Sequence, residues 1–233
     1  MVITMKKTAV FFMVILLMIG ACSCVKKEAN NGSVVNAMVA YVNEKYPEDE
    51  FYYKAPTGGG AGASQKTIIV SSKNYPNNDI YIRYSIIDEH EVYSDNYLSV
   101  KYAEQTKSIV YKSFSRVFLN DFYLFYQPDN YACPNNSGNF SFEEYISSKD
   151  SNIGFVVIVN DTANHRNSIE RELEKILVDS GMCIRATIYF DDSNDLGSLT
   201  TENLYSYIFK KQYKDAFSFE MASAAGFSKS RWE

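Results

Sequence analysis

The feature that most constrains the fold is a strand–helix–strand pattern in the last third of the chain. Residues 153–159, "IGFVVIV", form a nearly continuous apolar run that is typical of a strand buried on both faces. Residues 183–190, "CIRATIYF", predict a second strand. Between them a helix is expected, with Asn167 and Glu170 as its capping pair and Gly181 as its end. The residues spaced to form its buried face are Ile169, Leu173, Ile176 and Leu177. Because strands joined by a helix usually pair in parallel with a right-handed crossover, this segment predicts a βαβ unit.

The first half of the chain predicts an antiparallel meander. A helix capped by Ser33 and ended by Pro47 is expected first. Three strands should follow it, at 51–55, 67–71 and 79–88; in the last of them isoleucines alternate with other residues, as in a half-buried strand.

The middle of the chain and the region after the βαβ unit complete the list of expected elements. Ser94 or Asp95 should cap a long helix, and an aromatic strand is expected at 122–126. Residues 127–139 predict a loop, and a last helix carries Leu204, Ile208 and Phe209. The fold class is therefore α+β, with the meander and the βαβ unit sharing one mixed sheet flanked by helices. We expect a single domain at 33–215 and an irregular C-terminal tail at 216–233.

The N-terminal residues predict where in the cell the protein is located. Lys6 and Lys7 precede an apolar run at 9–19 that is too short to cross a bilayer and matches the h-region of a signal peptide. The next residues, Ile19-Gly20-Ala21-Cys22, resemble the lipobox of bacterial lipoproteins. That resemblance implies a signal peptide at 1–21, a lipid on Cys22 and a tether at 22–32, on the extracytoplasmic side of the cell membrane. An ordinary secreted protein and a retained anchor are the alternatives, and Cys24 is the rival lipidation site.

The layout also resembles that of uncharacterised small surface lipoproteins of bacteria, which have a tyrosine-rich α+β domain behind a polar tether. Without residues 1–21, which contain two lysines and no acid, the net charge is 23 − 2 − 28 = −7. An acidic domain should stand off from an anionic membrane, so the lipid is expected to hold it there. The absence of a basic stripe in the sequence argues against nucleic-acid binding.

Two segments resemble ligand-binding loops, but each lacks a glycine that the corresponding motif requires. The glycine loop "TGGGAGASQKT" at 57–67 has Gln65 where a phosphate-binding loop needs glycine, and a strand rather than a helix should follow. A hairpin loop is expected there, with a lid over a ligand as the alternative. The segment 191–202 has Leu196 where a calcium loop needs glycine, so we expect a solvated loop and no metal.

Candidate site residues remain few. Asp161 and Asp191 follow two strands that should be parallel, and ligands of α/β sheets bind at such strand ends. Tyr97 and Tyr126 belong to aromatic segments that could stack on sugars or peptides, although tyrosines also fill cores. His90 and His165 lie in polar turns, and no catalytic motif is present. Cys133 and Cys183 could form a disulfide, with buried free thiols as the favoured alternative.

The sequence thus predicts a lipid-anchored, non-catalytic extracytoplasmic binding module without a cofactor. Its expected partners are the membrane, reached through the N-terminal lipid, and an envelope protein, a peptide or a glycan. The alternative function is a cell-envelope hydrolase that uses carboxylates near the strand ends. A transporter's solute-binding component is disfavoured because the chain has too few βα units for two lobes.

Overall fold

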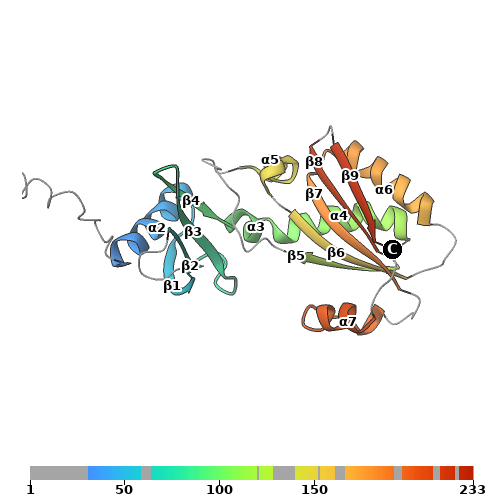
Figure 1. Ribbon diagram of the computed structural model, residues 1–233, viewed down its shortest axis with the longest axis horizontal. Helices are drawn as coiled ribbons and strands as arrows, with labels where there is room; N and C mark the ends of the chain where they lie inside the picture. Colours follow the sequence, from blue (N-terminus) through green and yellow to red (C-terminus); the bar gives the residue numbers. More distant parts are fainter. Residues whose placement is uncertain are drawn as a thin grey trace, which may run out of the picture.

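The structure is a computed structural model that describes residues 31–58, 64–119, 121–127, 140–151, 153–160, 166–191, 196–211, 216–223 and 226–232. Several residues of the sequence analysis lie outside these ranges: Cys22, Cys24, Cys133, Asp161 and His165. In Figure 1 the described elements form two groups at opposite ends of the long axis, connected through residues 97–101. We call these groups the N-terminal lobe, formed by the elements between residues 31 and 95, and the C-terminal lobe, formed by the elements between residues 103 and 232.

The N-terminal lobe is a helix packed on an antiparallel meander. Helix α2 (Asn31–Lys45) precedes β1 (Phe51–Gly58), β2 (Gln65–Ser72), β3 (Ile80–Ile87) and β4 (His90–Asp95), which pair in the order β1-β2-β3-β4. The predicted meander is confirmed, with β4 as an additional strand. The helix begins at Asn31, two residues before the predicted cap. The fully buried apolar side chains of the helix and the sheet include Met38, Val42, Tyr46, Ile68, Val70, Ile80 and Ile82.

The long helix predicted in the middle of the chain is divided in two. Asp95 accepts a hydrogen bond from the backbone N–H of Tyr97, where α3 (Tyr97–Lys101) begins. Tyr102 separates it from α4 (Ala103–Phe118), although the backbone bond from Tyr102 N to Leu98 O, 2.9 Å, continues across the break. Leu119 ends α4 in the left-handed conformation, at φ 53°.

The C-terminal lobe contains the mixed sheet. Its strands are β5 (Phe122–Gln127), β6 (Ile153–Asn160), β7 (Ile184–Asp191), β8 (Ala216–Ser223) and β9 (Gly226–Trp232), paired in that order. Strands β6 and β7 are parallel and all other neighbours antiparallel. Helix α6 (Arg166–Ser180) connects the parallel pair and ends at Gly181, whose φ of 66° favours glycine. The predicted βαβ strand pairing is confirmed.

Two predictions about the sheets were wrong, although the α+β class is confirmed. The meander and the βαβ unit lie in separate sheets, because β4 leads into α3 and α4 rather than into a strand beside β6. Residues 216–232 are not an irregular tail but a hairpin that adds β8 and β9 to β7. Its sequence signal is the alternation of Phe217, Phe219 and Met221 with polar or small residues.

Further short elements surround the second sheet. Helix α5 (Phe142–Ser147) was not predicted, although Ser141 and Glu144 form a complete capping box at its start. Two 3-10 turns, η1 (Lys149–Ser151) and η2 (Leu196–Ser198), flank the sheet, and α7 (Leu204–Lys211) is the last helix. Within the described ranges, no helix is long and apolar enough to cross a membrane.

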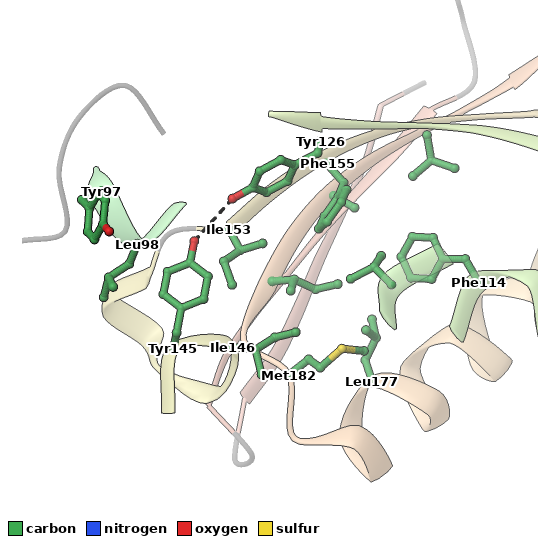
Figure 2. Packing of buried hydrophobic residues seen from close by; sticks show 14 of the residues in the cluster. Tyr97, Leu98, Phe114, Tyr126, Tyr145, Ile146, Ile153, Phe155, Leu177 and Met182 are labelled. Carbon is green, nitrogen blue, oxygen red and sulfur yellow. Dashed lines mark hydrogen bonds between the residues drawn. The ribbon is translucent and has the colours of Figure 1, made fainter. Parts of the chain in front are cut away.

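The two faces of the second sheet are covered differently. Phe155 and Val157 belong to the main core, with residues of α4 and α6. The intervening residues Val156 and Ile158 face the opposite side, where they form a smaller cluster with Leu204 of α7. Figure 2 shows the main core near α3, where Tyr126 and Tyr145 point their hydroxyls toward each other. One cluster of buried apolar residues therefore continues from one lobe into the other.

Candidate functional site

The carboxyl ends of β6 and β7 come together as the sequence predicts. Asn160 and Asp191 end these strands and pair in register, and Asn160 Nδ2 donates to Asp121 Oδ2 at 2.9 Å. Asp161 follows Asn160 but lies outside the described residues. Asp191 is only 1% exposed, and its Oδ2 accepts a hydrogen bond from the hydroxyl of Tyr207 on α7. In this arrangement Asp191 fixes α7 against the end of the sheet.

Helix α7 presents aromatic rings on the side that faces away from this anchor. Leu204 is fully buried against the sheet, whereas Tyr205 and Phe209, one helical turn apart, are 54% and 82% exposed. The ring of Tyr205 meets the half-buried ring of Phe125 edge-on, with centroids 6.2 Å apart. We call Phe125, Tyr205 and Phe209 the α7 aromatic face. Such rings supply much of the binding energy at protein interfaces and can stack on sugars.

The side chains that lie beneath the α7 aromatic face form an apolar cluster. Tyr189 on β7 packs with the cluster under α7. Burial, with a smaller contribution from Tyr205, raises the pKa of the Tyr189 hydroxyl, so that side chain stays neutral. The α7 aromatic face therefore rests on an apolar cluster, which suits it to contact rather than to proton transfer.

Tyr97 and Tyr126 do not lie on a surface. They are 1% and 5% exposed; Tyr97 begins α3, and Tyr126 lies on β5. The Tyr126 hydroxyl donates to Ser99 O at 3.2 Å, and the Tyr145 hydroxyl donates to Ser99 Oγ at 3.2 Å. The two hydroxyls are 3.4 Å apart (Figure 2). We call Ser99, Tyr126 and Tyr145 the tyrosine junction; because Ser99 belongs to α3, it joins that helix to the C-terminal lobe.

Buried carboxylates of the N-terminal lobe were not identified from the sequence. Asp95 accepts bonds from the hydroxyls of Tyr41 and Tyr46, both at 2.9 Å, and from Lys45 Nζ at 2.7 Å. The side chains of Lys45 and Asp95 are 7% and 1% exposed, so the ion pair is buried. This carboxylate is surrounded by donors and stabilises the lobe. The abundance of tyrosine beside acidic residues was the available signal.

Asp49 forms the second buried centre. It accepts the hydroxyls of Tyr97, at 3.0 Å, and Ser72, as well as the backbone N–H groups of Glu50 and Asn74. Burial opposes its ionisation, but these hydrogen bonds outweigh burial and hold the pKa of Asp49 below its usual value. Burial, followed by the bond to Asp49, raises the pKa of Tyr97. Asp49 and Asp95 together form the carboxylate network of this lobe.

The remaining candidates give simpler outcomes. Lys66 and Thr67 lie within β2, so a strand follows the glycine loop as predicted, and residues 59–63 lie outside the described part. His90 begins β4 and is exposed. Cys183 is a buried free thiol whose Sγ donates to Ser147 O at 2.9 Å, and burial raises its pKa.

The described residues contain no group of three or more histidine, cysteine, aspartate or glutamate residues placed to hold a metal ion. Among their buried side-chain polar atoms, Thr106 Oγ1 has no hydrogen-bond partner; it lies in the first turn of α4.

Comparisons with known proteins add little to this geometry. The sequence matches no protein-family model, and no curated protein matches it. A crystal structure of a DUF5037 family protein from Ruminococcus gnavus ATCC 29149 aligns with 83% of this chain and 94% of its own, at 15% identity and a TM-score of 0.37. A likeness of that size assigns neither fold nor function.

Proposed function

We propose that the protein is a lipid-anchored extracytoplasmic interaction module that binds an envelope protein, peptide or glycan through the α7 aromatic face. The lipobox-like segment ending at Cys22 supports the anchor. The exposure of Tyr205 and Phe209 on a firmly held helix supports the contact surface. The carboxylates described above accept hydrogen bonds from the protein itself, which favours binding over catalysis.

The observation that carries this proposal is the contrast between the two sides of α7. Leu204 is buried, and Tyr207 bonds a buried carboxylate, so the helix cannot turn its rings inward without breaking these contacts. Phe209 remains 82% exposed. A partner that covers these rings removes apolar area from water at roughly 25 cal/mol per Å², with no prior rearrangement of the helix.

Binding is tested by replacing the two rings together, in a Tyr205→Ser, Phe209→Ser variant. The soluble chain from residue 25 is used to capture partners from envelope extracts, and captured proteins and glycans are quantified against the unchanged chain. Aromatic hot spots contribute about 2 kcal/mol or more each, so recovery of a specific partner should fall at least about tenfold. Leu119→Asn is the matched control, because Leu119 is also 82% exposed and asparagine suits its left-handed backbone. Equal losses in both variants would contradict the proposal.

Anchoring is tested separately with Cys22→Ser. The variant should appear in the soluble fraction, because a chain without the acyl groups loses about 0.8 kcal/mol per buried CH₂ of membrane affinity. Cys24→Ser is the control and should stay with the membrane. Retention of the Cys22→Ser protein would remove the lipid anchor from the proposal and leave the binding surface to be judged on its own.

The hydrolase alternative places catalysis at Asp191 and Asp161. Asp191 would have to exchange its bond from Tyr207 for substrate or water. A Tyr207→Phe variant removes the hydroxyl bonded to Asp191 while keeping the ring, so any hydrolytic activity of Asp191 should change in that variant. We therefore treat the enzyme as the second function, and assays of envelope glycan and peptide hydrolysis decide it.

A further inference from the structure

The hairpin that joins β3 and β4 carries exposed apolar residues where a soluble protein usually has polar ones. Ile86 and Ile87 are 50% and 55% exposed, and the four residues after them are exposed as well. Among those four, Asp88, Glu89 and Glu91 are acidic. We call residues 86–91 the hairpin tip. It combines aliphatic surface with a concentrated negative charge.

The backbone of the tip departs from the usual chemistry of such turns. Asp88 and Glu89 are the two loop residues, and both have positive φ, 49° and 65°. Two-residue turns with positive φ at both positions favour Asn-Gly, because glycine and asparagine adopt this region with little strain. Glutamate does not share that preference. A sequence selected only for a stable hairpin would therefore differ at the turn and at both isoleucines, and such departures concentrate at functional sites.

The tip is nevertheless held in place. Ile86 pairs with Glu91 and Ile87 pairs with His90 across the strands. Ile86 N also donates to Ser64 O at 3.0 Å, which ties the tip to the end of the glycine loop. Because successive residues of a strand point to opposite faces, the two isoleucines cover both faces of the hairpin.

Glu91 is positioned by tyrosines of the same sheet. It accepts the hydroxyl of Tyr93 at 3.0 Å and that of Tyr84 at 3.3 Å. Burial and the neighbouring Glu91 carboxylate raise the pKa of Tyr93 to about 12, so this donor is neutral at physiological pH. The two hydroxyls therefore hold the Glu91 carboxylate at a fixed place beside Ile86.

We propose that the hairpin tip inserts into an apolar cleft, rimmed by lysine or arginine, on a different protein. Apolar surface on both faces suits a cleft better than a flat surface. The three carboxylates match a basic rim, and they oppose both an anionic lipid surface and a tip-to-tip contact between two copies of this chain. This inference concerns the N-terminal lobe and depends neither on the α7 aromatic face nor on the lipid anchor.

The test begins with a photo-crosslinking amino acid in place of Ile87, in the full chain produced by its native cells. The same amino acid in place of Val178, which is 45% exposed on α6, is the control. We expect an adduct of one defined mass from position 87 only. An adduct equal in mass to two copies of this chain, an adduct to lipid, or no adduct above the control would overturn the proposal.

The partner protein identified by crosslinking is then purified without the crosslink. Its Kd for the unchanged chain and for variants of the hairpin tip is measured at low and high salt. Ile86→Thr, Ile87→Thr keeps β-branched residues and should weaken binding at least tenfold, whereas Val178→Thr should not. Asp88→Asn, Glu89→Gly should raise the Tm of the protein and still weaken binding several-fold at low salt, with a smaller salt dependence than the unchanged chain. Binding that is indifferent to either variant, or a crosslinked site without basic residues, would also overturn the proposal.

Discussion

The two lobes bury their interiors by different chemistry. In the N-terminal lobe, tyrosine hydroxyls and Lys45 converge on Asp95, which is almost completely buried. In the C-terminal lobe, Leu173 and Leu177 of α6 are fully buried among the apolar side chains of the main core. The N-terminal lobe also buries apolar side chains such as Val42 and Ile68, and the carboxylate network adds hydrogen bonds between α2 and the end of β4.

Because of this difference, we expect different kinds of substitution to destabilise the two lobes. Removing one partner of a buried ion pair leaves an uncompensated charge, which destabilises a protein strongly. Removing apolar volume leaves a cavity, with a loss that depends on how far the neighbours can relax. Removing a buried charge partner should therefore be the most damaging change in the N-terminal lobe, and removing buried apolar volume the most damaging change in the C-terminal lobe.

The largest effect is expected from Asp95→Ala. Lys45, with a side chain 7% exposed, would lose its counter-charge, and three donors would lose their acceptor. We expect the free energy of unfolding to fall by about 3–5 kcal/mol, measured by urea denaturation. Asp79→Ala breaks the exposed pair with Lys54 and should change stability by less than about 1 kcal/mol. Similar losses for both substitutions would remove the distinction between the lobes.

Leu177→Ala is the matching test in the C-terminal lobe. Leu177 is fully buried, so its truncation leaves a cavity between α6 and the sheet and should reduce stability by about 2–5 kcal/mol. The neighbouring Val178 is 45% exposed, and Val178→Ala should have a small effect. Hydrogen exchange should show the loss of protection in β6 and β7 before β2 and β3; uniform loss would mean that the lobes unfold as one unit.

The tyrosine junction tests how strongly the lobes are coupled. Tyr126→Phe and Tyr145→Phe each remove one hydroxyl bonded to Ser99 and should reduce stability by about 0.5–1.5 kcal/mol. Because the two hydroxyls are 3.4 Å apart, the double variant should lose less or more than the sum of the single variants. Strict additivity in urea denaturation would show that the hydroxyls act independently. Tyr111→Phe, an exposed tyrosine on α4, is the control.

The smallest effect is expected from acid. The pKa of Asp49 in the folded protein lies below its usual value of 3.8, so the hydrogen bonds to its carboxylate contribute stability above that value. As the pH falls through the folded pKa, the carboxylate is protonated and that contribution is lost. The free energy of unfolding of the N-terminal lobe, measured by urea denaturation, should therefore fall as the pH decreases. In the Asp49→Asn variant this free energy should depend less on pH. An unchanged pH profile in Asp49→Asn would assign the acid sensitivity to other groups.

Local sequence patterns predicted most elements of both lobes but not how their sheets are arranged. The apolar run of β6, the helix ended by Gly181 and the strand β7 are short-range signals, and the structure confirms them. Whether β3 and β6 share a sheet depends on contacts between distant segments, and no local pattern encodes it. The hairpin of β8 and β9 had a readable alternation, and α5 had a readable capping box; both were missed.

The sequence predicted the position of the candidate site at the ends of the parallel strands, but not the residues that contact Asp191 there. Asp191 does end a parallel strand, but its partner Tyr207 comes from a helix whose position depends on long-range packing. Tyr97 and Tyr126 could not be assigned to core or surface from sequence, because both roles use the same residue type. The exposure of Tyr205 and Phe209 follows from the orientation of α7, which the sequence alone does not give.

The order of strands in the second sheet also separates the lobes in time. The N-terminal lobe pairs only neighbouring strands, so its sheet can be completed as soon as residues up to 95 are free to fold. The C-terminal lobe needs β8 and β9, so its sheet stays open until residue 232 is made. Local antiparallel pairing is fast, and a parallel pair that closes a long loop is slow. The growing chain should therefore carry a finished first lobe beside an unfinished, aggregation-prone sheet edge at β7.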